Sequence, residues 1–460
     1  MGNHVDSKTS KKAVLFIATM VSFLGPFMGS AFNIALPSIG KDLGIDAVLL
    51  TWTSTSFLVA AAVFLVPFGR LADIYGRRKI FTYGITIWTI SSVLSAFSTS
   101  ASMLIAFRIL QGIGGAMTFG TAVAILISVY PFGERGKVLG INVAAVYFGL
   151  SMGPFLGGLL TQHFGWRSVF LINLPLGIII MTLVFWKLKG EWAEAEGEKF
   201  DLSGSIIYGL SLVVLMVGLF LLPRAAAVWP IIVGVLGIIA FIRWEMRVES
   251  PVLHMDLFRN NPVFAFSNLA ALINYAATFA VTFLMSLYLQ YNKGFSPQAA
   301  GLLLVSMPAM QAIFSPLAGR LSDRIEPRIL ASLGMVLSTI GLSMLIFLEQ
   351  DTTIGFILAS LIILGLGFGL FSSPNTNAVM SSVEKRSYGV ASATLGTMRQ
   401  LGMILSMGIA MITFVVFIGR AEITPEYYPA FIQSLHIAFI VFTALCFGGI
   451  FASMARGKIR

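Results

Sequence analysis

A short basic loop occurs twice in this chain, each time between two long apolar runs. The first copy, GRLADIYGRRK, spans residues 69–79, and the second, GRLSDRIEPR, spans residues 319–328. Each copy places an aspartate among arginines, Asp73 in the first and Asp323 in the second. A polar hinge repeated between membrane-length runs predicts two similar halves, with both loops on one side of a membrane.

The apolar runs themselves have the length of membrane-spanning helices. Of the 460 residues, 57% are apolar and 11% are charged, whereas soluble domains carry about 25% charged residues. A hydrocarbon layer about 30 Å thick requires about 20 apolar residues per helix. We therefore predict an all-α integral membrane protein with fourteen transmembrane helices. The predicted spans lie near residues 13–39, 48–69, 80–98, 103–130, 138–161, 168–187, 203–222, 228–244, 262–291, 298–318, 329–348, 353–381, 388–418 and 431–454.

The predicted spans fall into groups of six, two and six. We expect an N-terminal six-helix bundle over residues 1–190, a linker with a two-helix insert over 191–260, and a C-terminal six-helix bundle over 261–460. The two bundles would form a parallel pseudo-repeat, which is the plan of one large class of transporters.

The distribution of Lys and Arg predicts the orientation. Most of the 30 basic residues fall in loops on the side of the N-terminus and of the two repeated loops. The positive-inside rule then places both termini of a multi-pass cell-membrane protein in the cytoplasm. The net charge of +10 needs no nucleic-acid partner, because these basic residues lie in short loops between apolar spans.

Four motifs follow the first loop in chain order. They are Arg108-Ile-Leu-Gln111-Gly112, Gly149-x-x-x-Gly153-Pro154-x-x-Gly157-Gly158, Trp166-Arg167-x-x-Phe170-x-Ile172-Asn173-x-Pro175 and Arg399-Gln400-Leu401-Gly402. Together with the loop, they make nearly the whole chain resemble the major facilitator superfamily, and within it the fourteen-helix drug:proton antiporter group. The loop departs from the family pattern only at Ile74, where a basic residue is usual.

The resemblance implies a conformational latch at the repeated loops. Asp73 would face the N-terminal end of the thirteenth span, where a carboxylate is stabilised by the helix dipole, in one conformation only. The alternative is a solvated basic loop. The predicted latch residues are Gly69, Asp73, Gly76, Arg77, Arg78, Arg320 and Asp323.

A second implied device is a helix-packing hinge on the fifth span. Glycines at every fourth position let a neighbouring backbone approach closely, and a proline inside a helix bends it. The resemblance associates this pattern with export and with halves that rock against each other. The hinge residues are Gly149, Gly153, Pro154, Gly157 and Gly158.

Two arginines lie within predicted spans, one in each half. Ionisable groups inside a membrane are costly and mark functional positions by default. Arg108 and Arg399 could therefore bind substrate or couple transport to an ion. The alternative is a structural arginine bonded to backbone carbonyls of a bent first or ninth helix.

A substrate and coupling cavity is expected between the halves, lined by the first, fourth, ninth and twelfth spans with help from their neighbours. Amides and hydroxyls near two cations suit a neutral, zwitterionic or anionic amphiphile, although some of these side chains would only bond neighbouring helices. The candidates are Asn33, Arg108, Gln111, Asn142, Tyr147, Asn274, Tyr275, Gln311, Asn375, Asn377, Arg399 and Gln400.

An acidic residue is missing where the resemblance expects one. The family's first helix usually carries an aspartate before an Asn-x-Ala-Leu-Pro signature; here the signature begins at Asn33 and Met28 occupies the acidic position. No acidic residue lies within a predicted span. A buried carboxylate is the usual proton carrier, so both proton coupling through this helix and a cationic substrate are in doubt.

These features favour a secondary transporter that exports small amphipathic organic molecules or drugs by alternating access. Coupling to protons is one alternative, and an uncoupled or non-proton-coupled facilitator of a neutral or anionic solute is the other. An enzyme is not expected, because the single Cys and four His form no nucleophile–base pair or metal cluster. We expect no cofactor, no metal and no nucleotide-binding loop, and a monomer in the lipid bilayer.

Overall fold

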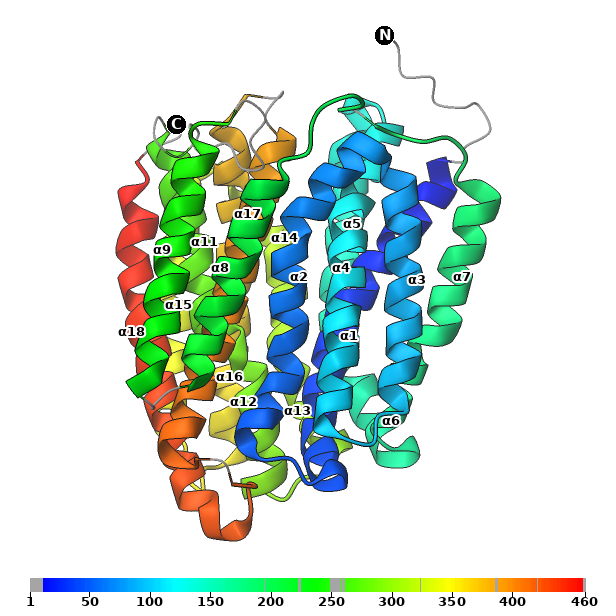
Figure 1. Cartoon of the computed structure of the whole chain (residues 1–460). Helices are drawn as coiled ribbons and strands as arrows, with labels where there is room; N and C mark the ends of the chain where they lie inside the picture. The colour runs from blue at the N-terminus through cyan, green and yellow to red at the C-terminus, as the bar shows by residue number, and fades with distance from the viewer. Residues whose placement is uncertain are drawn as a thin grey trace.

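The computed structural model describes residues 11–193, 195–221, 225–248, 258, 261–322, 324–384, 388–419 and 421–457. Among these, residues 132, 133, 135–137, 220, 388 and 389 are described by their backbone alone. The architecture is all-helical in the described part, as predicted from the apolar runs (Figure 1).

The N-terminal half contains α1 (Lys11–Leu43), α2 (Ala47–Tyr75), α3 (Arg77–Ala96), α4 (Ala101–Val129), α5 (Phe132–Phe164), α6 (Arg167–Leu171) and α7 (Asn173–Lys187). Two helices follow, α8 (Leu202–Leu221) and, after the short turn η1 (Ala225–Ala227), α9 (Val228–Glu245). The C-terminal half contains α11 (Pro262–Thr278), α12 (Ala280–Leu287), η2 (Tyr288–Asn292), α13 (Pro297–Leu304), α14 (Ser306–Ser322), α15 (Pro327–Leu345), α16 (Ile354–Ser381), α17 (Tyr388–Phe417), η4 (Pro425–Tyr427) and α18 (Tyr428–Ala455).

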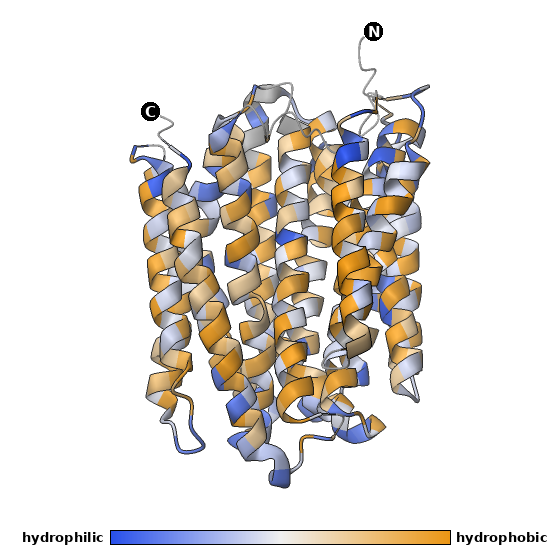
Figure 2. Ribbon diagram, turned by 60° about the vertical axis from the view of Figure 1, so that its left-hand side comes forward, coloured by the Kyte–Doolittle hydropathy of each residue, from blue (hydrophilic) through white to orange (hydrophobic). Residues whose placement is uncertain are grey.

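Thirteen helical segments in the described part are long and apolar enough to cross a membrane. The predicted span at 80–98 coincides with α3, which has 20 residues but begins Arg77-Arg78-Lys79 and is rich in Ser and Thr. α3 is therefore less apolar than the thirteen segments. The count of fourteen transmembrane helices stays a prediction. Apolar residues dominate the length of the helices and polar ones gather at the two ends (Figure 2).

Two predicted spans of the C-terminal half are broken helices. The span at 262–291 changes from α11 to α12 at Phe279, where the N–H of Ala280 donates to Ser406 Oγ at 2.9 Å. The span at 298–318 is divided at Val305, and Pro308 stands in the first turn of the helix that restarts there. A proline has no N–H and is tolerated at a helix start. Side-chain bonds and prolines thus explain breaks that hydropathy alone does not reveal.

Both repeated loops lie at the end of the bundle that carries the two termini. At the opposite end, the N–H of Ala47 at the start of α2 donates to the carbonyl of Ala421, which precedes α18. The other ends of α2 and α18 therefore lie at the terminal end of the bundle, the end at which α1 begins (Figure 1). The end of α14 joins them, because Asn377 Nδ2 near the end of α16 donates to Ser322 Oγ at 2.8 Å.

The described acidic residues lie at helix ends or in loops. The helices extend beyond the predicted spans, so Asp42, Asp73 and Glu245 belong to the last turns of α1, α2 and α9 rather than to loops. All three lie beyond the ends of the predicted spans, which contain no Asp or Glu. The middle of each described helix likewise carries no Asp or Glu.

Glycines bring α3 and α4 into backbone contact. A Cβ at Gly114 would lie 2.7 Å from the backbone N of Trp88 and 2.8 Å from the carbonyl O of Gly84, whereas a Cβ at Gly29 would meet nothing within 4 Å. Backbone atoms cannot rotate away as a flexible side chain can, so the space at Gly114 is fixed by the packing of the two helices.

We predict that Gly114→Ala destabilises the protein and Gly29→Ala does not. Overpacking costs about 1–3 kcal/mol, whereas an unhindered Gly→Ala change in a helix gains roughly 0.5–1 kcal/mol. Thermal unfolding in detergent should show a lower melting temperature for Gly114→Ala alone. Equal melting temperatures for the two variants would contradict the close α3–α4 packing.

Candidate functional site

Arg108 on α4 is enclosed by neutral groups. Its side chain is 2% exposed, its Nε donates to the Thr53 carbonyl on α2 at 3.1 Å, and its guanidinium donates to Gln111 Oε1 at 2.5 Å. The rings of Phe32 and Phe57 lie on the guanidinium, with centroids 4.4 and 4.5 Å from its carbon. Aromatic faces and carbonyls stabilise a cation without a carboxylate. This favours the structural interpretation, with α2 rather than the first or ninth helix supplying the carbonyl.

Gln111 extends this enclosure to α3. While its carbonyl accepts from Arg108, its amide donates to Ser92 Oγ at 2.5 Å. Gln111 has no exposed surface. The side chain therefore holds a buried cation in place and is not free to contact a solute.

Arg399 on α17 has a more open environment than Arg108. Its guanidinium donates to Thr376 Oγ1 on α16 at 2.7 Å and lies 5.7 Å from the ring centroid of Tyr275 on α11. Its Nε, although buried, has no hydrogen-bond partner in the described structure. Arg399 therefore has a buried donor, Nε, without a partner among the described residues, and its side chain is less buried than that of Arg108.

Tyr147 on α5 joins the two halves near the middle of the bundle. Its hydroxyl donates to Ser372 Oγ on α16 at 3.2 Å and accepts from Ser315 Oγ on α14 at 2.9 Å. Thr376, the partner of Arg399, lies one turn after Ser372 and donates to the Ser372 carbonyl. A continuous polar group therefore runs from Tyr147 of one half to Arg399 of the other, and we call it the Tyr147–Arg399 cluster (Tyr147, Ser315, Ser372, Thr376, Arg399 and Tyr275).

Several predicted cavity residues instead bond helices within one half. Asn142 accepts from Ser22 and donates to the Ala18 carbonyl, which ties α5 to α1. Asn375 donates to the Ser267 carbonyl and Asn377 donates to Ser322. These three amides therefore bond neighbouring helices, which was the alternative role given above for the predicted cavity residues.

Other members of the set are buried. Asn33, Asn274 and Gln311 are nearly inaccessible. Both amide atoms of Asn274 and the Oε1 of Gln400 have no partner among the described residues. Because α11 and α17 pack closely, with a Cβ at Gly402 lying 2.5 Å from the Leu272 carbonyl, these amides lie on neighbouring helices of the C-terminal half.

Met28 is fully buried on α1, and Asn173 Nδ2 lies 3.1 Å from its sulfur. A thioether is only a weak acceptor, and the Oδ1 of Asn173 has no partner in the described structure. No titratable group is therefore present at the position where the resemblance expects a proton carrier.

The glycine motif of α5 has two faces. Gly149, Gly153 and Gly157 pack against α1 in the same half, where a Cβ at Gly149 would lie 2.5 Å from the Phe23 carbonyl. Gly158 faces the other half, and its Cβ would lie 2.5 Å from the Pro297 carbonyl of α13. Pro154 in turn packs against Gly301. Only Pro154 and Gly158 of the predicted hinge therefore contact the opposite half.

At the end of the bundle away from the termini, hydrogen bonds to backbone carbonyls join the two halves. Ser286 Oγ donates to the Asn33 carbonyl at 2.6 Å and Gln290 Nε2 to the Ile34 carbonyl at 2.9 Å. The Ala47–Ala421 backbone bond adds to them. We call this set of contacts between the halves the distal seam.

At the terminal end, the first repeated loop is folded on itself. Asp73 Oδ1 accepts from Arg77 Nε at 2.8 Å, and Arg77 also donates to Ser128 Oγ on α4. Asp73 thus pairs within its own half in this structure. The side chains at the start of α17 and Asp323 of the second loop lie outside the described residues, and Arg320 is exposed at the end of α14.

Arg456 is a buried cation that was not among the predicted site residues. It follows the last apolar run, yet it is 1% exposed and donates to Asn375 Oδ1 at 2.9 Å and to the Ser453 carbonyl at 2.7 Å. Burial lowers the pKa of Arg456 to about 10, so it remains protonated at neutral pH. Its role is to dock the end of α18 against α16.

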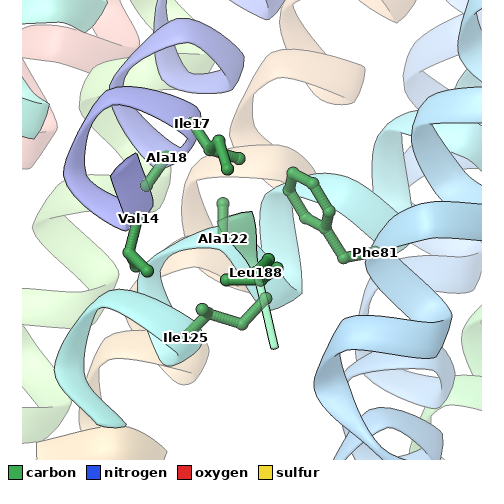
Figure 3. A pocket seen from close by; sticks show the side chains of 7 residues that line it. All are labelled: Val14, Ile17, Ala18, Phe81, Ala122, Ile125 and Leu188. Carbon is green, nitrogen blue, oxygen red and sulfur yellow. The ribbon is translucent and has the colours of Figure 1, made fainter. Parts of the chain in front are cut away.

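A small pocket at the terminal end of the N-terminal half contains none of the predicted cavity residues. Its lining is apolar throughout (Figure 3) and consists of Val14, Ile17, Ala18, Phe81, Ala122, Ile125 and Leu188. Within the described ranges, no three His, Cys, Asp or Glu side chains gather as metal ligands. This pocket and the Tyr147–Arg399 cluster therefore lie in different parts of the protein.

Comparison with known proteins gives consistent matches over most of the chain. The profile of the Major Facilitator Superfamily matches residues 15–407 and 267–456. The riboflavin transporter RibZ of Clostridioides difficile is 28% identical over 96% of each chain. The cephamycin export protein CmcT of Amycolatopsis lactamdurans is 32% identical, covering 93% of this chain and 90% of that protein.

A likeness in fold accompanies these matches. A bacterial homologue of the human lysosomal transporter Spinster, crystallised in an inward-facing and unoccupied conformation, superposes with a TM-score of 0.66 at 20% identity, covering 97% of each chain.

We predict that Gln111→Leu destabilises the protein by about 2 kcal/mol, because a buried cation and Ser92 lose a hydrogen-bond partner. Gln400→Leu is the matched control, since its Oε1 has no partner to lose. The melting temperature in detergent should fall for Gln111→Leu only. A larger fall for Gln400→Leu would show that the two glutamines have the opposite roles.

Proposed function

The chain belongs to the major facilitator superfamily, and from this we propose that it is a secondary transporter that exports small amphipathic organic molecules by alternating access. Several similar proteins are named as exporters or multidrug resistance proteins, at 29–32% identity, among them Multidrug resistance protein 3 of Bacillus subtilis. Since the matched proteins are transporters, the chain is not an enzyme. Within the superfamily we propose the fourteen-helix drug:proton antiporter group, with α8 and α9 as a two-helix insert between bundles 1–190 and 261–460.

The observation that carries the proposal is the way in which the two halves are bonded to each other at the distal seam. The distal seam is made of hydrogen bonds to backbone carbonyls, which can form and break without a change in helix structure. The Tyr147–Arg399 cluster lies between the halves at mid-depth. A seam that opens while the terminal end closes would expose this cluster to each side in turn, which is the requirement of alternating access.

The charge of the cluster supports a neutral or anionic substrate. Arg399 supplies a cation with an unused donor, and Tyr147, Tyr275 and Gln400 add polar and aromatic surface. Arg108 is enclosed by its own neighbours, so we assign substrate contact to Arg399 and a structural role to Arg108. The named cargoes of similar proteins, riboflavin and a cephamycin, are compatible with an amphipathic organic solute for this chain.

The orientation and partners of the protein complete the proposal. We place the termini and both repeated loops in the cytoplasm, on the positive-inside rule. The substrate is then taken up from the cytoplasmic end, and the single chain provides the complete pathway as a monomer. Protons remain a candidate partner through the acidic residues at helix ends.

A facilitator that is not coupled to protons is the second candidate. The observation that favours it is Met28, whose only polar neighbour found in the described structure is the Asn173 amide. With no carboxylate in the middle of any described helix, proton carriage would have to use Asp73 or another acidic residue at a helix end.

Purified protein in liposomes tests both candidates. We expect transport of riboflavin or carboxyfluorescein and no transport of the cation ethidium, because the cluster carries a cation and no carboxylate. Arg399→Gln should raise the KM for carboxyfluorescein by about tenfold, the equivalent of about 1.4 kcal/mol. A transport rate that rises when a pH gradient is applied identifies the antiporter. A transport rate that does not change with the gradient identifies the facilitator. Transport of ethidium alone would refute the substrate class.

We predict that Asp73→Asn slows turnover by about tenfold while the KM changes little, since the loop is distant from the cluster. A charge-assisted hydrogen bond contributes roughly 1.5–3 kcal/mol. The Asp73 side chain is 35% exposed, so we expect the contribution of the Asp73–Arg77 pair to lie at the low end of this range. Asp351→Asn, a loss of the same charge in an exposed loop at the far end, is the control. Unchanged turnover of Asp73→Asn in the same liposomes would refute the latch.

A further inference from the structure

The described part of the connector between α7 and α8, residues 188–193 and 195–201, lies across the first repeated loop. We call it the strap; Figure 1 shows it running over the terminal ends of α2 and α3. Its backbone is bonded to the loop at two points. The carbonyl of Trp192 accepts from the N–H of Arg77 at 2.9 Å, and the N–H of Ala195 donates to the carbonyl of Asp73 at 3.0 Å.

Glu191 of the strap caps the N-terminal end of α3, although it lies far from α3 in the sequence. The residue before α3 is Gly76, which has no side chain to cap the first turn. The cap comes from Glu191 Oε1, which accepts from the N–H of Arg78 at 2.7 Å. A carboxylate at this position also faces the positive end of the helix dipole.

Gly76 makes room for this carboxylate. Its φ is +114°, a conformation that other residues rarely adopt. A Cβ at this position would lie 2.5 Å from Glu191 Cγ. The Glu191 side chain therefore occupies its place only because residue 76 is a glycine.

Two further contacts fix the ends of the strap. Glu198 forms an ion pair with Arg70 of the loop. Trp192 is 8% exposed and belongs to the main hydrophobic core, as does Leu188, which closes the small pocket between α1, α3 and α4 (Figure 3). A passive linker between two helices would need neither a buried Trp nor a cap.

We propose that the strap holds the loop in the arrangement in which Asp73 pairs with Arg77, and thereby favours the conformation that is closed at the distal seam. Asp73 connects the two sets of contacts, because its carbonyl is bonded by the strap and its carboxylate by Arg77. Movement of the loop toward the other half must stretch or break the strap contacts. The connector is thus a third part of the conformational machinery, besides the two halves, and this role is independent of the substrate.

Cysteine reporters in the full-length protein test the proposal without any substrate. The buried Cys446 is first replaced by Ser, and one reporter thiol is then introduced in each of two places. The strap reporter, Ala195→Cys, detects undocking of the strap, and the seam reporter, Ala47→Cys, detects opening of the distal seam, since these alanines are 7% and 1% exposed. The rate of reaction with N-ethylmaleimide is measured for each reporter, because a buried thiol reacts only when its surroundings open.

The strap is weakened by Glu191→Ala combined with Glu198→Ala. We expect the reaction rate of the strap reporter to rise about tenfold and that of the seam reporter to rise several-fold, because two charge-assisted contacts are lost. Glu196→Ala, the same change at an exposed strap residue, should leave both rates unchanged. Glu191→Gln retains an acceptor and should give a smaller rise, which separates capping from general damage.

Two outcomes would overturn the proposal. An unchanged rate of the strap reporter in the double variant would show that these carboxylates do not hold the strap. A faster strap reporter with an unchanged seam reporter would show that the strap acts on the loop alone and does not bias the distal seam. Size-exclusion profiles identical to that of the parent protein establish that each variant is folded.

Discussion

Lipid offers no hydrogen bonds to a protein backbone, and this constraint explains most of the structure. Every backbone group within the hydrocarbon layer must find its hydrogen-bond partner within the protein, so the loops lie at the two ends and the chain between them is helical except at short breaks. In the function that we propose, the halves move as packed bundles, and the contacts between them decide which end is open. Where α11 breaks at Phe279, the freed N–H of Ala280 finds a side chain, Ser406, as the same constraint requires.

The contacts between the halves differ in kind from those within each half. Within the N-terminal half, Arg108 is held by a carbonyl, an amide and two aromatic faces, and separating these groups would leave a buried cation without partners, which is costly. Between the halves, hydroxyl and amide side chains of α12 and η2 reach carbonyls of α1. Such neutral bonds contribute about 1 kcal/mol each, so the seam can open at moderate cost while each half stays intact.

The sequence predicted the all-helical membrane architecture, whereas the breaks at Phe279 and Val305 and much of the site became visible only in the structure. Hydropathy located the helices, because lipid requires long apolar runs, and the repeated loops at Gly69 and Gly319 indicated two halves with the loops at one end. It could not show that Arg108 is enclosed and Arg399 is open, since both are single arginines in apolar runs. Hydroxyl residues such as Ser315, Ser372 and Thr376 were missed because they are common in membrane helices, and only their shared contact with Tyr147 or Arg399 distinguishes them. Arg456 was missed because it follows the last apolar run and its burial depends on Asn375 of another helix.

The position of the acidic residues links coupling to the conformational latch. Met28 is not titratable, and the described carboxylates lie at helix ends or in loops, so a proton that drives transport would have to bind there. Asp73 is one such residue, and its charge is needed to pair with Arg77. Loss of that pair would also loosen the loop arrangement that the Asp73 carbonyl shares with Ala195 of the strap. The loop and the proposed substrate cluster are thus separate, with the latch at the end of the bundle and the cation Arg399 near its middle. In the function that we propose, a contact at the end of the pathway can be released without a carboxylate beside the substrate, so coupled export and an anionic cargo are compatible in one chain.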